Sequence, residues 1–226
     1  MAVCAEPYRQ YGDPPRLDGV FNQSVDGARQ LRYGDANEYD VEVWDVRANK
    51  RLSGFNGLSG FVNAANISAD GRKVVTAERT GIVGLWDAET GEEIRLLRGH
   101  GDQIQDARFS PDGKLIASGA RDGTARTWDS ETGAQIAVHQ QQGGSYIDAV
   151  SFSPNGQWVL SAGNGWAEIW NARSGEVHSS TKIGPENEGA FTTFVRFSPD
   201  GKAILVMDDE GKQADRIPLM MPLPLN

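Results

Sequence analysis

Three residues near the middle of the chain carry the groups that nucleophilic catalysis requires. His100, Ser118 and Asp122 lie within one short stretch of the sequence. A serine hydroxyl, an imidazole and a carboxylate in hydrogen-bond contact form the relay of acyl-transfer enzymes. The same three groups can also satisfy one another inside a packed core, where they perform no chemistry. The choice between a catalytic and a structural role therefore depends on the elements that position them.

Other kinds of chemistry find little support in the sequence. The chain has one cysteine, Cys4, and three histidines without close cysteine or carboxylate spacing, so we expect no metal site. His139 and His178 are predicted to lie on the surface of outer strands. Asp208–Glu210 is predicted to be a solvated acidic loop rather than a cation site. No glycine-rich phosphate loop, nucleophile elbow or zinc helix motif is present, so no cofactor is expected.

A repeat with a fixed period runs through the chain. Its tryptophans stand 42 residues apart, at Trp44, Trp86, Trp128 and Trp170. Five residues after each tryptophan comes a residue type that tolerates positive φ: Asn49, Gly91, Gly133 and Gly175. A second turn motif of the type Ser-Pro-Asp-Gly recurs in one phase, within residues 67–71, 109–113, 152–156 and 197–201. The chain is therefore predicted to be a repeat protein.

One period contains four short strands. In the third copy these are predicted at 103–109, 114–119, 124–129 and 134–139, because apolar and polar residues alternate between turn motifs. A single four-stranded antiparallel sheet cannot bury both of its faces. Stacking successive sheets around an axis buries them, and this arrangement predicts an all-β fold of the β-propeller type.

The tryptophan-aspartate pairs at 44–45, 86–87 and 128–129, the Asp/Asn-Gly turns and Gly99-His100 resemble the WD-repeat β-propeller family. The resemblance covers roughly residues 17 to 215. It implies a buried hydrogen-bond network of His, Ser or Thr, Asp and Trp in each blade. The third copy matches at all four positions, with His100, Ser118, Asp122 and Trp128. This structural role is expected in place of a catalytic one, because the network would be sealed under Trp128.

The other copies match this network only in part. The second offers Thr76 and Trp86, with Leu58 near the histidine position and Thr80 at the aspartate position. The fourth offers Ser161, Asn164 and Trp170 without a histidine. The last copy has no tryptophan, and Arg216 lies near its place. Only the third blade is therefore predicted to have the full network.

A single domain over residues 1–226 accommodates about five blades, of which the first and the last are degenerate. The blades are predicted at 17–55, 56–98, 99–140, 141–183 and 184–226. Proteins that resemble this family usually have seven, so three ways of covering the ends remain open. Five blades close in one chain, with residues around Ala2 to Arg9 as the last outer strand; two chains assemble one ring as a homodimer; or the chain is part of a larger propeller. We favour the first.

Composition narrows the possible partners. There are 22 Lys and Arg against 31 Asp and Glu, a formal net charge of −9, which argues against nucleic acid and anionic membranes as partners. No apolar run reaches the roughly 20 residues of a membrane helix, and the N-terminus does not resemble a signal peptide. With one cysteine, no internal disulfide can form. A cytoplasmic location is expected.

A non-catalytic scaffold that binds proteins or peptides is the function that this reading favours. A polar residue recurs near the start of each first strand, at Asn63, Gln105, Asp148 and Thr193. Together with Asp106 these residues are predicted to line the central rim as a net-acidic ring that receives a basic segment. The alternative is that they only hydrate a central channel. Trp166, an extra aromatic beside Trp170, is predicted either to pack between blades or to be an exposed binding anchor.

Two other classes of function remain as alternatives. An enzyme with its active site in the funnel would need carboxylates with His or Lys in one phase of several copies, and the polar row offers neither His nor Lys. A sensor or scaffold fragment of a larger multidomain protein is the third possibility.

Overall fold

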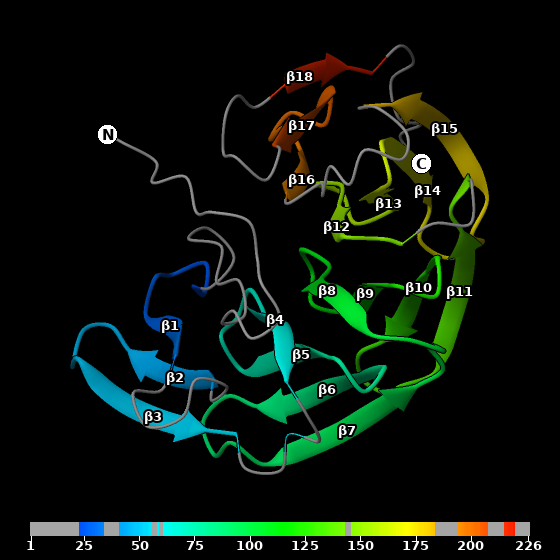
Figure 1. The fold of residues 1–226 in the computed structure, drawn as a ribbon. Helices are drawn as coiled ribbons and strands as arrows, with labels where there is room; N and C mark the ends of the chain where they lie inside the picture. The colour runs from blue at the N-terminus through cyan, green and yellow to red at the C-terminus, as the bar shows by residue number, and fades with distance from the viewer. Residues whose placement is uncertain are drawn as a thin grey trace.

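The computed structural model describes residues 23–33, 41–55, 58, 61–142, 146–183, 194–207 and 215–219. Within these ranges the regular elements are β-strands, and no α-helix occurs. The strands form five antiparallel sheets that follow one another around a common centre (Figure 1). The predicted all-β fold with propeller blades is therefore confirmed. No segment of the described residues is a helix long and apolar enough to cross a membrane.

The sheets follow chain order. The first contains β1 (Arg29–Tyr33), β2 (Val41–Asp45) and β3 (Lys50–Gly54). The second contains β4 (Val62–Ile67), β5 (Lys73–Glu78), β6 (Ile82–Asp87) and β7 (Glu93–Arg98). The third contains β8 (Ile104–Phe109), β9 (Leu115–Ala120), β10 (Thr124–Asp129) and β11 (Gln135–Gln140). The fourth contains β12 (Ala149–Phe152), β13 (Trp158–Gly163), β14 (Trp166–Asn171) and β15 (Val177–Lys182). The fifth contains β16 (Phe194–Phe197), β17 (Ala203–Met207) and β18 (Asp215–Pro218).

One turn is built in the same way in all five sheets; it lies between the first and second strands of the second to fifth sheets and just before β1 in the first. A serine hydroxyl donates to the carboxylate or amide oxygen two residues later, which also accepts the backbone N–H two residues further on. In the third sheet, Ser110 donates to Asp112 over 2.7 Å, and the Lys114 N–H donates to the same oxygen over 3.1 Å. The corresponding pairs are Ser24–Asp26, Ser68–Asp70, Ser153–Asn155 and Ser198–Asp200. The following glycine has positive φ in each copy, for example 71° at Gly113.

The second conserved turn follows each repeat tryptophan and also depends on a side-chain acceptor. Asp129 accepts the N–H groups of Glu131 and Thr132 over 3.0 and 2.7 Å, and Asp87 and Asn171 make the same contacts in their copies. In the first sheet, Asn49 adopts φ 47° at the position where the other copies have glycine. The turn signals in the sequence therefore correspond to real hydrogen-bonded turns.

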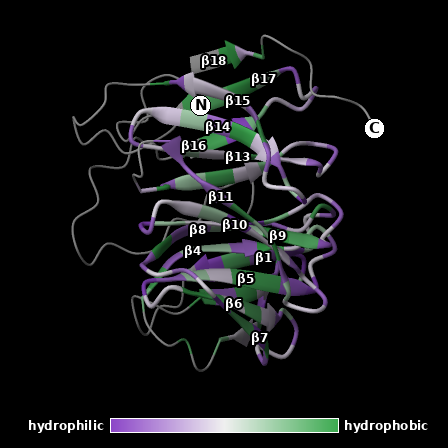
Figure 2. Cartoon of the chain, turned by 90° about the vertical axis from the view of Figure 1, so that its right-hand side faces the viewer, coloured by the Kyte–Doolittle hydropathy of each residue, from purple (hydrophilic) through white to green (hydrophobic). Residues whose placement is uncertain are grey.

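The hydrophobic core is divided into layers between neighbouring sheets. Each of four buried clusters combines residues of two consecutive sheets, as with Val75 and Leu85 against Ile116 and Trp128. Hydrophobic segments lie within the strands, and the turns at their ends are hydrophilic (Figure 2). Each sheet is thus stabilised by its neighbours, as expected for stacked repeats.

The strand predictions for the third copy agree with the structure to within one residue, at 104–109, 115–120, 124–129 and 135–140. The start of the predicted first blade, residues 17–22, lies outside the described residues, although Gln23 forms an isolated bridge to Gln30. The segment Ala2 to Arg9, expected to complete the last blade, also lies outside them. The described parts of the first and last sheets have three strands each.

Gly84 in β6 leaves space for the hydrogen bond of Trp86. A Cβ atom at this position would lie 2.5 Å from both Thr76 Oγ1 and Trp86 Nε1. We expect Gly84→Ala to lower the free energy of unfolding by about 1–3 kcal/mol, because the buried contacts around it must shift. Gly101→Ala is the control, since its Cβ would come no closer than 3.8 Å to Asp122 among the described residues. Urea denaturation of the two variants tests this, and equal stability would contradict it.

Candidate functional site

Each of the four repeat tryptophans donates its indole N–H to a side chain, but the acceptor differs from sheet to sheet. Trp128 donates to Ser118 Oγ over 2.9 Å, and Trp170 donates to Ser161 Oγ over 3.2 Å. Trp86 donates to Thr76 Oγ1 over 3.0 Å, whereas Trp44 donates to Glu42 Oε2 over 2.8 Å. A buried indole N–H needs such an acceptor, so these contacts help fix the geometry of each sheet.

In the third sheet, the network includes the three residues that could have formed a catalytic triad. His100 Nδ1 lies 3.0 Å from Asp122 Oδ2, and His100 Nε2 lies 2.8 Å from Ser118 Oγ. An ionised carboxylate only accepts, so Nδ1 carries the proton and Nε2 accepts from the serine hydroxyl. Ser118 is 0% exposed, and its oxygen already accepts the Trp128 N–H. A substrate cannot reach this hydroxyl, and the arrangement is a structural relay.

Burial and hydrogen bonding set the charge states of this relay. Burial lowers the pKa of His100 below its usual range, against the raising effect of the Asp122 carboxylate. Burial raises the pKa of Asp122, but hydrogen bonds from the Gly101 N–H and from Thr124 outweigh it and leave the pKa below its usual range. The pair is thus neutral imidazole beside carboxylate. A second proton on His100 would turn Nε2 into a donor and leave the Ser118 hydroxyl without its acceptor.

The lowered pKa of His100 predicts a pH dependence of stability. The folded chain binds this proton less tightly than the unfolded chain, so the contribution is complete above about pH 6.5 and is lost as the pH falls below it. In His100→Gln, the amide can donate to Asp122 and accept from Ser118 without titrating. We expect the fall in melting temperature from about pH 7 to about pH 5 to be smaller in this variant. An unchanged fall would contradict the role of His100.

The fourth sheet builds the same relay with glutamine. Ser161 Oγ donates to Gln141 Oε1 over 2.8 Å, and Gln141 Nε2 donates to the Trp166 carbonyl over 3.3 Å. Gln141 is buried, and its side chain accepts from the serine hydroxyl as His100 does in the third sheet. The full set of His, Ser, Asp and Trp is thus seen in the third sheet, while in the fourth sheet Gln141 takes over the contact with the serine, which the sequence did not predict. An amide offers one acceptor and one donor group, as does a neutral imidazole.

The predicted surface position of His139 is wrong. It was expected on the surface, but it is 4% exposed and lies between the third and fourth sheets. Its Nε2 lies 2.8 Å from Glu168 Oε2, and its ring stacks on Trp170 with centroids 5.2 Å apart. Burial raises the pKa of Glu168, but hydrogen bonds from His139 and the Gln142 N–H leave that pKa below the usual range. His178 is half-buried, and its ring lies 5.0 Å from that of Trp158.

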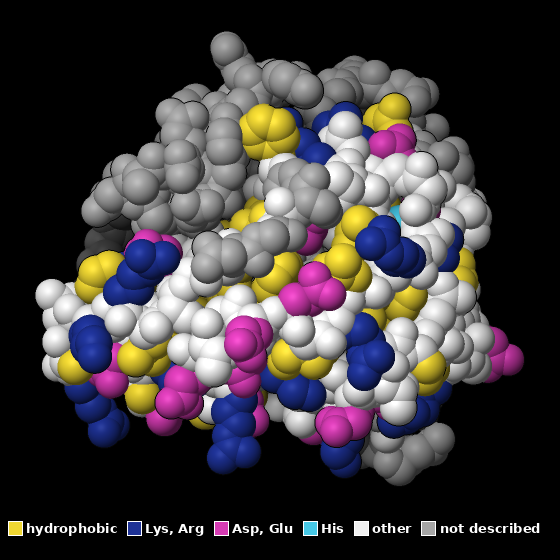
Figure 3. All heavy atoms as spheres, turned by 90° about the horizontal axis from the view of Figure 1, so that it is seen from below, with side chains coloured by type: hydrophobic (Ala, Val, Ile, Leu, Met, Phe, Trp, Pro, Cys, Tyr) yellow, Lys and Arg dark blue, Asp and Glu magenta, His cyan; other side chains and the backbone are white. Residues whose placement is uncertain are grey.

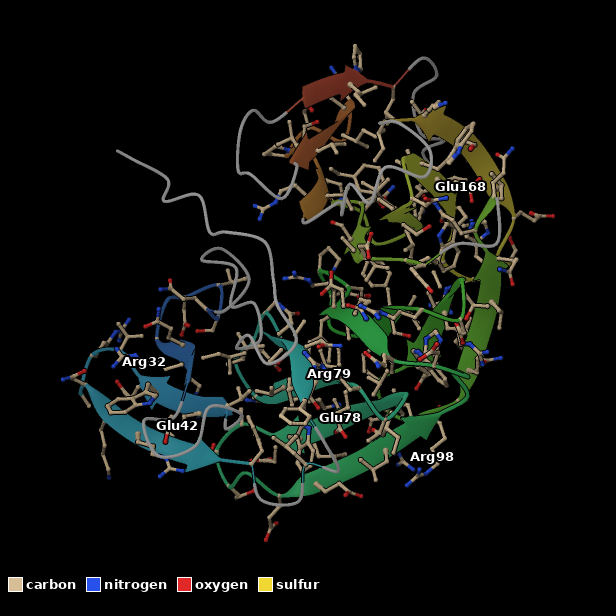
Figure 4. All side chains as sticks on the ribbon, viewed as in Figure 1. Arg32, Glu42, Glu78, Arg79, Arg98 and Glu168 are labelled. Carbon is tan, nitrogen blue, oxygen red and sulfur yellow. The ribbon has the colours of Figure 1, made fainter. Side chains whose placement is uncertain are left out.

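In the second sheet, a fully buried carboxylate takes part in the network. Thr76 Oγ1 lies 3.5 Å from Glu78 Oε1, and the Thr80 hydroxyl donates to Glu78 Oε2 over 3.3 Å. Leu58, which stands near the histidine position in the sequence, packs against the hydrophobic cluster between the first two sheets. Figure 4 shows Glu78 in this sheet, close to Arg79.

The first sheet carries the most exposed version of the tryptophan hydrogen-bond network. Glu42 accepts the Trp44 indole N–H and forms an ion pair with Arg51 over 2.9 Å. The Arg32 guanidinium lies 4.6 Å from the centre of the Trp44 ring. Trp44 is half-buried, whereas Trp86, Trp128 and Trp170 are buried against the preceding sheet. Arg32 of β1 and Glu42 of β2 are cross-strand partners, and Figure 4 labels both in this sheet.

The polar row predicted on the first strands corresponds to a recurring β-bulge. The register of β4 with β5 shifts between Val62 and Ala64, and that of β8 with β9 shifts between Ile104 and Asp106. Asn63 and Gln105 are therefore the additional residues that form the bulge in β4 and in β8. Asp148 has the same place, because its N–H donates to the Ala162 carbonyl while Ala149 also pairs with Ala162. Bulges of this kind re-aim side chains. Thr193, the fourth member, lies outside the described residues.

Two predicted rim residues are not exposed. Asp106 is 4% exposed; it forms an ion pair with Arg108 over 2.9 Å and accepts the Val150 N–H of β12 over 3.1 Å. Asn63 is buried and donates to the Ile104 carbonyl of the next sheet over 2.8 Å. The prediction that they form part of an exposed, net-acidic ring is wrong, because they fasten neighbouring inner strands to one another. Gln105 and Asp148 are half-buried.

Two aromatic side chains beside the bulge residues were missed in the sequence. Phe61 immediately precedes β4 and is 38% exposed, and Tyr146 precedes β12 and is 53% exposed. Arg79 lies over the Phe61 ring at 5.3 Å from its centre, and Arg121 lies over the Tyr146 ring at 5.5 Å. The signal was an aromatic residue just before the first strand in two copies. Their arginine partners are distant in the sequence and could not be assigned.

Hydrogen bonds connect these two pairs through the third sheet. Arg79 Nε donates to Asn63 Oδ1 over 3.0 Å, and Asn63 reaches the backbone of β8. The Arg121 N–H donates to the Gln103 carbonyl, and the Ile147 N–H donates to the Ala120 carbonyl. These contacts follow the inner ends of the second to fourth sheets. We refer to the residues concerned as the inner rim: Phe61, Asn63, Arg79, Gln105, Arg121 and Tyr146.

The remaining predicted site residues lie elsewhere. Trp166 begins β14, opposite Lys182, and is half-buried. Its carbonyl accepts from Gln141, so it belongs to the core network of the fourth sheet at least through its backbone. Asp208–Glu210 lies outside the described residues. Among those described, no group of three or more His, Cys, Asp or Glu side chains is placed to hold a metal ion.

The side of the molecule shown in Figure 3 carries Lys or Arg and Asp or Glu side chains interspersed, with hydrophobic side chains in small groups. This side therefore has no field of one sign that would select a charged partner.

Comparison with known families supports the assignment of the repeats. The family model described as WD domain, G-beta repeat matches residues 91–129 and 134–171. The first match contains Ser118, Asp122 and Trp128, and the second contains Ser161 and Trp170. A search of curated proteins gave no match. The matched repeats, together with the antiparallel sheets of the structure, show that residues 91–171 contain WD repeats and support a WD-repeat protein.

Proposed function

We propose that this chain is a non-catalytic scaffold that binds a protein or peptide partner at the inner rim. The observation that carries the proposal is the pair of partly exposed aromatic rings, Phe61 and Tyr146, each with an arginine over it at the same end of its sheet. Aromatic and arginine side chains dominate the binding energy of protein interfaces. WD40 repeats generally serve as platforms for protein partners, which agrees with this assignment.

The rim is well suited to binding because it is rigid. The bulge residues are held by hydrogen bonds between neighbouring inner strands, such as that from Asn63 to the Ile104 carbonyl. A pre-organised surface loses less conformational entropy when a partner binds. The enzymatic alternative has less support, since the serine of the one triad-like constellation is buried under Trp128.

The proposal is tested by affinity capture followed by mass spectrometry. The variant Phe61→Ala/Tyr146→Ala removes both rings, and Val177→Ala removes an equally exposed side chain from the outer strand β15. We expect proteins captured by the wild-type chain to be lost with the rim variant and retained with the control. Both variants should melt as the wild type does, because the replaced side chains are exposed. Retention of every partner by the rim variant would refute the proposal.

For the domain itself, we propose one five-bladed propeller over residues 1–226, located in the cytoplasm. Support comes from the five sheets among the described residues and from the single cysteine, Cys4. Light scattering is expected to give a molar mass near 24.5 kDa with one cooperative melt. A mass twice as large would instead indicate a ring shared by two chains.

A further inference from the structure

The inner rim carries two arginines and the Gln105 amide, beside one half-buried carboxylate, Asp148, at the bulge of the fourth sheet. Arg79 lies over Phe61 in the second sheet. Arg121 lies over Tyr146 where the third sheet meets the fourth. Asp106, the carboxylate expected to make the rim acidic, lies buried in an ion pair with Arg108. Figure 4 shows Arg79 beside the inner strand β4, whereas Arg98 projects outward from the outer strand β7.

The place of Arg121 over the Tyr146 ring leaves it able to bind an anion. A guanidinium that lies over a ring uses its flat face, and its N–H groups point outward in the plane of the group. Those N–H groups match the two oxygens of a carboxylate. Arg121 is exposed, and within the described residues its side chain forms no ion pair with a carboxylate. It is therefore the strongest candidate contact for an anionic partner.

Gln105 provides a second and independent observation. It is the bulge residue of β8, between the two arginine–aromatic pairs, and its Nε2 is buried without a hydrogen-bond acceptor among the described residues. A buried donor without an acceptor is energetically costly. The residue is itself half-buried, so a rotation of its side chain presents the amide to a partner. A carboxylate or carbonyl oxygen is the complement of this group.

The overall charge of the chain works in the opposite direction. With a formal net charge of −9, long-range attraction favours a basic partner. At physiological ionic strength, however, exposed charges beyond about 8 Å are largely screened, so contacts at the rim itself dominate. Local donors and the long-range field therefore make opposite predictions, which allows experiment to separate them.

We propose that the inner rim binds an extended acidic segment of a protein partner, whose carboxylates contact Arg121 and Arg79 and whose backbone or side-chain oxygen accepts from Gln105. This inference rests on the proposed function and specifies its partner. It replaces the basic segment expected from the sequence. Tyr146 and Phe61 supply ring surface for an apolar or aromatic residue within that segment.

Three fluorescein-labelled peptides of one length test this inference by fluorescence anisotropy against the full chain. Each has a central tyrosine, flanked by glutamates in the first, lysines in the second and glutamines in the third. We expect the glutamate peptide to bind most tightly. Arg121→Glu should weaken it at least tenfold, and Gln105→Leu, which keeps the size but removes the amide, should weaken it by a few-fold.

Arg98→Glu is the matched control, because it makes the same change of charge at an exposed arginine on the outer strand β7. Glutamate-peptide affinity should be nearly unchanged in this variant. An equal loss with Arg98→Glu, or tighter binding of the lysine peptide, would overturn the inference. If the lysine peptide bound to the wild-type chain and bound more weakly to Phe61→Ala/Tyr146→Ala, the result would support the proposed function and refute the acidic partner. If none of the peptides bound, the acidic-segment inference would fail, while the capture experiment would still decide the proposed function.

Discussion

Replacing Trp170 with alanine is expected to lower the free energy of unfolding by about 3–5 kcal/mol. Trp170 is fully buried between the third and fourth sheets, where it stacks on His139 and packs in one cluster with Ala137 and Val159. Its removal would leave a cavity of an entire indole. It would also deprive Ser161 of the donor that completes the relay to Gln141.

Trp44→Ala provides the control for this prediction. Trp44 occupies the same place in the repeat, but it is half-buried and covered on one side by Arg32. We expect the loss to be about 1–2 kcal/mol, since less apolar surface returns to water. Urea denaturation monitored by circular dichroism measures both variants. Equal losses would mean that Trp170 is not stabilised by the neighbouring sheet, contrary to the packing described above.

The second large effect is expected from breaking the buried pair of His139 and Glu168. Both residues are nearly inaccessible, and their side chains are joined by a hydrogen bond of 2.8 Å. His139→Ala leaves the Glu168 carboxylate buried without its main partner, at an expected cost of about 3–5 kcal/mol. The Gln142 N–H still donates to Glu168 Oε2, but it cannot replace the imidazole.

The double variant His139→Leu/Glu168→Met distinguishes a polar requirement from a packing requirement. Apolar side chains of similar size remove both polar partners together, and buried pairs replaced in this way often lose little stability. We expect the double variant to be more stable than His139→Ala. The single variants His139→Leu and Glu168→Met complete the cycle, and a double variant whose loss equals the sum of these two single losses would show that the residues are not coupled.

The turns and strands of this chain could be predicted from the sequence because local chemistry determines them. The Ser-x-Asp-Gly turn satisfies its own backbone groups, as Ser110 and Asp112 do, wherever the chain places it. Trp128 with Ser118 and His100 could likewise be recognised, because the third repeat retains every member of the network at the expected spacing. These features depend on few contacts outside their own sheet.

Burial at the contacts between sheets could not be read in the same way. Simple alternation in the outer strand 135–140 would turn Ile136 and Val138 inward, yet Ala137 and His139 are buried and Val138 is 43% exposed. The cause is a bulge opposite Trp128, which shifts the register between Thr127 and Trp128. One extra residue reverses which side chains face the next sheet. The role of Gln141 was missed for a related reason, because it lies in a connection whose path the sequence does not specify.

The predicted placement of Asp106 and Asn63 on an exposed ring was wrong because exposure was inferred from polarity. Asp106 is polar but lies where two inner strands meet, and its carboxylate accepts a backbone N–H from the next strand. The arginine–aromatic pairs depend on contacts such as that of Arg121 with Tyr146, which joins the third sheet to the fourth. Such pairings follow from the stacking of sheets and have no local signature.

The central claim, that the inner rim contacts a protein partner, is tested most directly by site-specific photo-crosslinking. A photoreactive phenylalanine analogue replaces Tyr146 in one variant and Val177 in another, two positions that are 53% and 52% exposed. After irradiation of cells that contain each variant, we expect a discrete crosslinked protein from position 146 and none from position 177. The same adducts from both positions, or adducts from position 177 alone, would contradict the account.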